Sequence, residues 1–280
     1  RSVSRGLGDV YKRQMQSKLI SESEIQEMLQ FTSVSHAAAW LKRTPEYAKA
    51  WADLDENSLH RGQIEKLLKA SIFKDFSKIY QFANPEQRKF LDLYSRRYEI
   101  RVLKEIMTNL FDHKSTDAVD VSPYCDFFRR HSKLDLDRLT ACTTMDEFIN
   151  TLKGNEFYVP LSRIQNHDTA LLFDYGMALD LYYFSMIWNV RKKLFSGKDL
   201  EQITTAYGEK FDMLNLQFIS RSKRYFSMAP ADIYALLIPM NYKLKKEEIT
   251  ALVEASTREE AQQIFRKTYY GKKYDHLSCL

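Results

Sequence analysis

Apolar residues recur every three or four positions through most of the chain, a spacing that predicts amphipathic α-helices. A long helix is predicted over 199–226, and a second over 84–111, where Asn84 is a suitable N-cap and Pro85 suits the first turn. Eight glycines and six prolines are few for a hairpin-rich β fold. The predicted fold class is therefore all-α. The apolar stripe expected on the helix over 199–226 consists of Ile203, Tyr207, Phe211, Leu214 and Phe218.

The two long helices share a pattern of residues. An aromatic residue, an acidic residue five positions later and a leucine four positions after that occur in both helices, always 113 residues apart. Such a pattern is weak in one helix, but its repetition in register indicates duplicated units. The equivalent pairs are Tyr94 and Tyr207, Glu99 and Asp212, and Leu103 and Leu216.

Helix-capping residues repeat at nearly the same interval. Ser33 and Thr144 are predicted N-caps, the latter with Glu147 in a capping box, and Ser256 with Glu259 forms another such box. Each cap precedes a tyrosine by fourteen residues, and the caps are 111 and 112 residues apart. The tyrosines are Tyr47, Tyr158 and Tyr270.

These registers predict three homologous helical units. We assign residues 15–121 to helical repeat 1, residues 122–239 to helical repeat 2, and residues 240–280 to the first half of helical repeat 3. The chain would then be a fragment that stops before the third long helix. In such a fragment, apolar residues including Ile249, Leu252 and Ile264 are expected to lack neighbours.

The first fourteen residues are interpreted as foreign to the protein. Residues 9–14 read back to codons that resemble the transposon-end adapter of shotgun sequencing libraries, so residues 1–14 are treated as a non-native adapter-derived scar. They carry much of the excess positive charge, and the rest of the chain has about +2 of the total +5. So small a charge does not favour nucleic acid as a partner.

One apolar stretch, residues 171–190, is long enough to span a bilayer. It contains Asp174 and Asp180, each of which would cost several kcal/mol in lipid. We therefore predict a helix packed within a bundle. The two carboxylates, six residues apart, point away from each other on such a helix and do not form an acid–base pair.

Residues suited to catalysis or metal binding are not combined in any known spacing. No histidine follows an acidic residue by three positions, and three cysteines without a CxxC pair predict neither a zinc site nor a disulfide framework. Walker, GxGxxG, HExxH and GxSxG patterns do not occur. The sequence predicts no catalytic residue, no metal site and no cofactor.

Clusters of basic residues are the remaining candidates for contact with a partner. Most are explained by the preference of cations for helix C-termini, about 0.3–1 kcal/mol each. The cluster at the end of the helix over 199–226 could also contact an acidic partner. Its candidate partner-contact residues are Arg221, Lys223 and Arg224.

The order and spacing of three segments, 97–104, 178–184 and 212–216, resemble the C subunit of the A-type/V-type ATP synthase, whose vacuolar counterpart is called the d subunit. The segment 235–244 fits as well, and the similarity covers residues 15–278. Asp212 and Asn215 match the D-x-x-N pattern of that family, whereas the first repeat has Glu99 and Val102. Glu99, Asp180, Asp212 and Asn215 are the candidate structural residues.

The resemblance implies a funnel of three helical subdomains about a pseudo-threefold axis, with the third truncated here. It further implies a non-catalytic rotor subunit that links the D and F subunits of the central shaft to the membrane proteolipid (c/K) ring. Such a subunit couples ATP hydrolysis or synthesis to H⁺ or Na⁺ transport, without a cofactor or nucleic acid. It would be cytoplasmic and attached to the membrane peripherally, through the membrane sector.

An alternative from another class is an unrelated all-helical repeat scaffold or adaptor, or a helical enzyme whose active site lies outside this sequence. A flanking sequence without a third long helix carrying an acidic residue would favour that alternative.

Overall fold

The structure is a computed structural model that describes residues 10, 13–52, 55, 59–112, 121, 125–165 and 170–274, without the side chains of residues 46, 49 and 50. These residues form α-helices joined by turns, with no strand among them, which confirms the all-α prediction. The chain divides into two compact units, Arg1–Asn155 and Glu156–Leu280. The predicted repeat boundaries lie elsewhere and stay a prediction, and most of residues 1–14 fall outside the described ranges.

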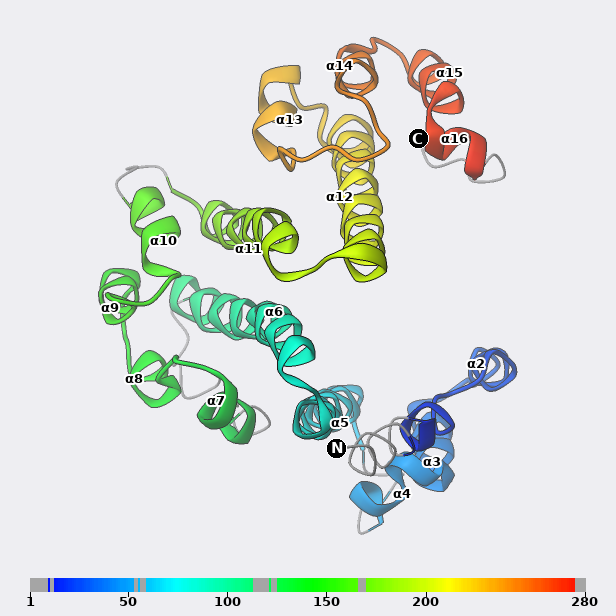
Figure 1. Cartoon of the computed structure of the whole chain (residues 1–280), viewed down its shortest axis with the longest axis vertical. Helices are drawn as coiled ribbons and strands as arrows, with labels where there is room; N and C mark the ends of the chain where they lie inside the picture. The colour runs from blue at the N-terminus through cyan, green and yellow to red at the C-terminus, as the bar shows by residue number, and fades with distance from the viewer. Residues whose placement is uncertain are drawn as a thin grey trace. The chain divides into compact units, whose positions relative to one another are not determined.

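The first unit contains the helices from α2 to α9 (Figure 1). Their bounds are α2 Glu22–Met28, α3 Val34–Arg43, α4 Pro45–Trp51, α5 Arg61–Phe82, α6 Pro85–Phe111, α7 Cys125–His131, α8 Leu136–Thr140 and α9 Met145–Thr151. Asn84 caps α6 by accepting a hydrogen bond from the Gln87 amide at 2.8 Å, and Pro85 follows in the first turn. This is the helix start that the sequence predicts.

Aromatic rings fill the space between α5, α6 and α7. Phe73 and Phe76 of α5, Tyr98 of α6 and Phe127 of α7 pack with ring centroids 4.9–6.0 Å apart. Edge-to-face pairs of this kind add to the stability gained from burying the rings. A second cluster, around Trp51, holds α3, α4 and α5 together.

The second unit contains the helices from α10 to α16. Their bounds are α10 Tyr158–Gln165, α11 Leu172–Leu194, α12 Gly197–Phe226, α13 Pro230–Leu236, α14 Lys246–Glu254, α15 Arg258–Lys267 and α16 Tyr269–Lys273. α12 packs against α11, α13 and α14. Within the described ranges, α11 included, no helix combines the length and the apolar character needed to cross a membrane.

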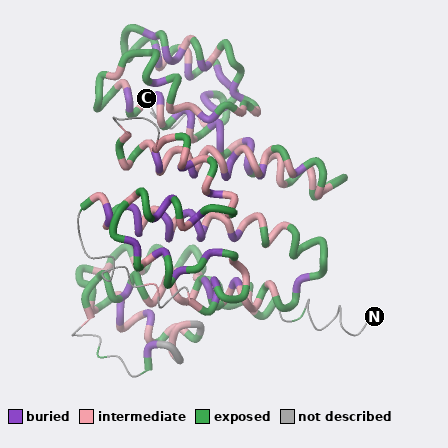
Figure 2. Tube along the Cα trace, turned by 90° about the vertical axis from the view of Figure 1, so that its left-hand side faces the viewer, coloured by how far each residue is buried: buried purple, intermediate pink, exposed green. Residues whose placement is uncertain are grey.

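The core of the second unit lies between α12 and the helices that follow it. Ile249 and Leu252 of α14 are 7% and 0% exposed, and Ile264 of α15 packs against the same cluster. The expectation that these residues lack neighbours is therefore wrong, because α12 and α13 already supply the opposing surface. Figure 2 colours the chain by burial and shows how buried and exposed positions follow one another along the helices.

α6 and α12 bury equivalent positions when they are aligned with the 113-residue offset. Six pairs of residues are buried in both helices, and three further α6 residues, Ile100, Met107 and Leu110, are buried where Met213, Ser220 and Lys223 of α12 are not. This agreement supports the register predicted from the sequence. The six pairs are Ser95 and Gly208, Tyr98 and Phe211, Glu99 and Asp212, Val102 and Asn215, Leu103 and Leu216, and Ile106 and Ile219.

The capping residues need two corrections. Glu147 does not close the predicted capping box with Thr144, because its carboxylate accepts from the Thr143 amide at 2.9 Å. Ser33 and Thr144 are N-caps as predicted, but Thr257, not Ser256, caps α15 by accepting from the Glu260 amide at 3.1 Å. The sequence places two hydroxyl residues before two glutamates, so either pair satisfies the pattern. With the corrected cap, Thr144 and Thr257 are 113 residues apart, the same offset as the long helices.

Candidate functional site: a buried polar clamp

The most organised polar site of the described chain lies on the face of α12 that looks toward residues 238–244. These residues, which we call the strap, connect α13 to α14. α12 extends over 30 residues, and its Asp212 and Asn215 are both 0% exposed. Because they are three positions apart, both side chains leave the helix on the same side. We call this pair, together with its bonds to the strap, the clamp.

Asp212 binds the C-terminal half of the strap through backbone amides. Its Oδ1 accepts from the Tyr242 N–H at 3.0 Å, while Oδ2 accepts from Lys243 and Leu244 at 2.6 and 2.9 Å. Hydrogen bonds to an ionised carboxylate are stronger than those between neutral groups. The three amides are donors that lie outside any helix, so the carboxylate replaces the partners that regular structure would have provided.

Asn215 binds the other end of the strap through a single residue. Its Nδ2 donates to the Ile238 carbonyl at 3.0 Å, and its Oδ1 accepts from the Ile238 N–H at 2.8 Å. This reciprocal pair requires both a donor and an acceptor, which an amide supplies and a carboxylate does not. The two α12 residues thus hold both ends of the strap, whose end residues Ile238 and Leu244 are each 1% exposed.

The side chain of Tyr242 in the strap approaches the backbone of α12 closely. A Cβ atom on Gly208 would lie 2.7 Å from the Cβ of Tyr242, closer than such atoms pack. The phenol of Tyr242 shares a hydrogen bond with the Thr205 hydroxyl at 3.1 Å, one turn earlier on α12. Glycine in a helix interior costs about 1 kcal/mol relative to alanine, and here the missing side chain makes room for the strap.

Tyr270 of α16 completes the coordination of the carboxylate. Its hydroxyl donates to Asp212 Oδ2 at 2.8 Å, and the residue is 1% exposed. Burial, and then the hydrogen bond to Asp212, raise the pKa of the Tyr270 phenol well above its ordinary value. The phenol therefore stays protonated and remains a donor. At the edge of the site Lys273 pairs with Glu209 at 3.0 Å, and this contact raises the pKa of the lysine.

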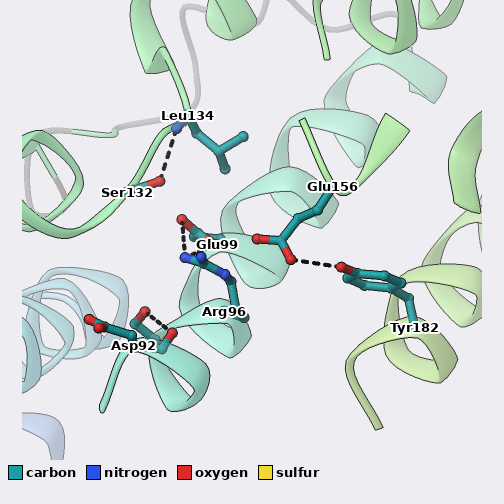
Figure 3. Close-up of polar contacts among 8 residues, drawn as sticks. Asp92, Arg96, Glu99, Ser132, Leu134, Glu156 and Tyr182 are labelled. Atoms are coloured by element: carbon teal, nitrogen blue, oxygen red, sulfur yellow. Dashed lines mark hydrogen bonds and ion pairs between the residues drawn. The ribbon is translucent and has the colours of Figure 1, made fainter. Parts of the chain in front are cut away.

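Glu99 of α6 is buried like Asp212 but is bound differently. The Glu99 side chain is 3% exposed and forms an ion pair of 3.2 Å with Arg96, one turn earlier on the same helix (Figure 3). Val102 occupies the position equivalent to Asn215 and is 0% exposed. In the second unit, Tyr182 donates to Glu156 at 2.7 Å (Figure 3). Asp180, the fourth candidate structural residue, is half-buried on α11.

The candidate partner-contact residues have different surroundings. Lys223 is half-buried, and its Nζ donates to the Ala255 carbonyl at the end of α14 at 2.6 Å. Arg221 and Arg224 are exposed, and the Arg224 guanidinium lies over the ring of Tyr225, 5.3 Å from its centre. Lys223 therefore supports the fold, and only the two arginines point to the surface.

The clamp is suited to binding the backbone N–H and C=O groups of the strap. Each Asp212 oxygen accepts bonds from within the chain, which leaves the carboxylate neither solvent contact nor a free site. Across the part of the chain that the structure describes, no group of three or more His, Cys, Asp or Glu residues could hold a metal ion. His113, His167 and His276 lie outside that part.

Comparison with known proteins identifies the family. A model of the family described as "ATP synthase (C/AC39) subunit" matches residues 12–278. The chain belongs to this family. The match includes both long helices, the strap and α16, and confirms the resemblance seen in the sequence.

Three curated relatives are named as the C subunit of an A-type ATP synthase. The proteins from Methanothermobacter thermautotrophicus, Methanosphaera stadtmanae and Methanosarcina mazei are 21%, 20% and 22% identical to the chain. The aligned parts cover 91%, 93% and 86% of this chain, in the same order. The chain spans 63–65% of the length of these relatives.

The sequence analysis identified Asp212 and Asn215 as candidate structural residues, but it did not identify the residues that they bind. The strap amides, Tyr242 and the bond from Tyr270 could not be assigned, since residues 23–58 positions apart had to be placed together. Gly208 gave a usable signal, because glycine inside a strongly periodic helix often marks a close approach of another segment.

Proposed function

We propose that the chain is a non-catalytic rotor subunit of a V/A-type ATP synthase or ATPase. In this proposal it links the central shaft, made of the D and F subunits, to the proteolipid ring of the membrane. It thereby transmits rotation between ATP hydrolysis or synthesis and the transport of H⁺ or Na⁺. It would work on the cytoplasmic side, attached peripherally through the membrane sector.

The observation that carries the proposal is the family match over residues 12–278. The names of the three curated relatives point to the A-type ATP synthase in particular. The clamp supports a mechanical role, because its buried polar residues fix one segment of the chain against a long helix. A subunit that passes torque needs such rigid internal joints more than reactive side chains.

The repeated order of helices supports the proposed arrangement of homologous subdomains. A long helix, two short helices and a threonine-capped helix follow one another as α6, α7, α8 and α9, and again as α12, α13, α14 and α15. We propose that these units form part of a funnel about a pseudo-threefold axis. Its cavity would receive the foot of the shaft, and its broad end would rest on the proteolipid ring.

Co-purification with the proposed partners tests this function. The chain, checked for helicity by circular dichroism, is mixed with a D–F complex and with detergent-solubilised proteolipid ring, and each mixture is run on a sizing column. Co-elution with both is the expected result. A folded chain that elutes apart from both would contradict the rotor function, and one that hydrolyses ATP alone would contradict the non-catalytic assignment.

A further inference from the structure

Two segments that are far apart in the sequence meet at one oxygen atom of Asp212. Its Oδ2 accepts from the Lys243 and Leu244 amides of the strap at 2.6 and 2.9 Å, and from the Tyr270 hydroxyl of α16 at 2.8 Å. α14 and α15 separate these donors along the chain. A carboxylate oxygen offers about two lone pairs, so three donors leave it no capacity to bind water.

The same two segments also touch outside the carboxylate. Lys243 of the strap and Lys273 of α16 both lie against the ring of Tyr269, with their ammonium nitrogens 5.8 and 5.6 Å from its centre. These distances fall within the ~6 Å range of a cation–π contact. Deeper in the unit, Leu244 and Tyr270 belong to one buried apolar cluster. The strap and α16 therefore contact each other as well as α12.

The burial of Asp212 depends on both segments together. The residue is 0% exposed, and its Oδ2 is bound by the strap amides and by the Tyr270 hydroxyl at the same time. If either segment moved away, water would reach the carboxylate and compete for the hydrogen bonds of the other segment. A hydrogen bond that competes with water contributes less than one in a water-excluded site. The loss of one segment is therefore expected to weaken the attachment of the other.

We propose that residues 242–244 and α16 form a latch, a pair of segments that opens from Asp212 and closes on it in one step. The apolar core around Leu252 of α14 stays closed when the latch opens, and Asn215 keeps its bonds to Ile238. A binding event that favours the open form of either segment would thereby release the other. The latch thus couples two places on the chain that α14 and α15 separate in sequence.

Native-state hydrogen exchange, read by NMR at single amides, tests the latch without any rotary ATPase subunit, so its failure is distinguishable from failure of the proposed function. In the wild type, the strap amides of Lys243 and Leu244 should exchange with the same opening free energy as the Lys272 amide of α16. Tyr270→Phe removes a donor from α16 alone, yet it should speed exchange of the two strap amides by about tenfold or more. Strap amides that stay within about twofold of the wild type, or unequal opening free energies in the wild type, would overturn the proposal.

Two further variants test the coupling in the other direction and its specificity. Tyr242→Phe weakens the strap by removing the hydroxyl that bonds α12, and should speed exchange of the Lys272 amide by about threefold or more. Tyr234→Phe removes another tyrosine hydroxyl that donates to a carboxylate, that of Glu254 at 3.0 Å, and should leave the latch amides within about twofold of the wild type. Unchanged exchange at Lys272 in the first variant, or equal acceleration by the second, would overturn the latch. An equal rise at the Leu252 amide of the core would mean that the whole unit opens and would also overturn it.

Discussion

α6 and α12 bury six equivalent pairs of positions, yet their buried polar residues bind different partners. On α6, Glu99 pairs with Arg96 of its own helix, and Val102 fills the next buried position. On α12, Asp212 and Asn215 bind backbone groups of the strap, more than 20 residues further along the chain. A two-residue difference thus turns a helix face from a packing surface into a site that holds another segment. The comparison can be tested by removing or exchanging these residues.

The largest effect is expected for Asp212→Ala. The change leaves the amides of Tyr242, Lys243 and Leu244 and the Tyr270 hydroxyl without their acceptor. Each buried donor left unsatisfied costs about 1–3 kcal/mol, and partial relaxation should limit the total to roughly 4 kcal/mol of unfolding free energy. Urea unfolding followed by circular dichroism measures the loss.

The matched control for this change is Glu99→Ala on α6. Its partner Arg96 is 21% exposed and can reach water, so the expected loss is about half as large. Equal losses for the two alanine variants would show that the backbone bonds of Asp212 add nothing beyond a buried ion pair.

A smaller effect is expected for Asn215→Val, which gives α12 the residue found on α6. The Ile238 N–H and carbonyl lose both partners inside a buried site, which should destabilise the protein by roughly 2–3 kcal/mol. Thermal unfolding of the variant and of Asn215→Asp separates the two bonds, because aspartate keeps only the acceptor. An aspartate variant as stable as the wild type would mean that the Nδ2 bond contributes nothing.

Gly208→Ala tests the close approach of the strap. The added methyl group collides with Tyr242, and the strain should outweigh the better helix propensity of alanine, giving a net loss of about 1–2 kcal/mol. In the Tyr242→Gly background, which removes both the ring and the Cβ that the added methyl group would meet, the same change should be neutral or stabilising. A double-mutant cycle measures this coupling. Additive changes would show that the ring moves aside freely.

Ser95→Ala on α6 is the control for the glycine change. Ser95 stands at the position equivalent to Gly208, is 1% exposed, and its hydroxyl donates to the Asp92 carbonyl at 2.8 Å. Removing that oxygen should cost less than about 1.5 kcal/mol, since no other segment is displaced.

The sequence predicted the parts of this comparison that depend on local patterns. Both long helices, the Asn84 cap and the equivalence of Glu99 with Asp212 follow from spacing and capping rules. The stripe predicted for α12 was only partly right, because Leu214 and Phe218 are half-buried while Asp212, Asn215 and Ser222 are fully inside. Hydrophobicity alone assigns polar residues to the surface, and only the strap amides explain why Asp212 and Asn215 lie in the interior.

The partners of the clamp depend on contacts that no local pattern encodes. Ile238 and Tyr270 are 23 and 58 residues from the α12 residues they bind, and their positions follow from how α13 to α16 fold back. The choice of Thr257 over Ser256 as a cap likewise depended on the helix start in three dimensions. The strap stood out only as part of the segment 235–244 that resembles the family, and no local pattern indicated which residues it binds.

The smallest effect is expected from pH, and it should involve the first unit. His131 of α7 packs against the ring of Tyr80, with centroids 4.3 Å apart, and against Phe76 and Phe127. Burial, opposed in part by the nearby Asp92 carboxylate and reinforced by Arg130, lowers the pKa of His131 below its ordinary value of 6.5. The folded state therefore takes up a proton less readily than the unfolded state, whose histidine has an ordinary pKa.

The sign of the pH effect follows from that difference. Stability contributed by neutral His131 is fully present above pH 6.5, declines as the pH falls below this value, and stops changing below the lowered pKa of the folded state. Between pH 7.5 and pH 5 the urea midpoint should fall more for the wild type than for His131→Phe. The phenylalanine keeps an aromatic ring but cannot take up a proton. The clamp lies in the other unit and should respond identically in both proteins. An equal fall in both would place the pH sensitivity outside the aromatic cluster and remove this difference between the two units.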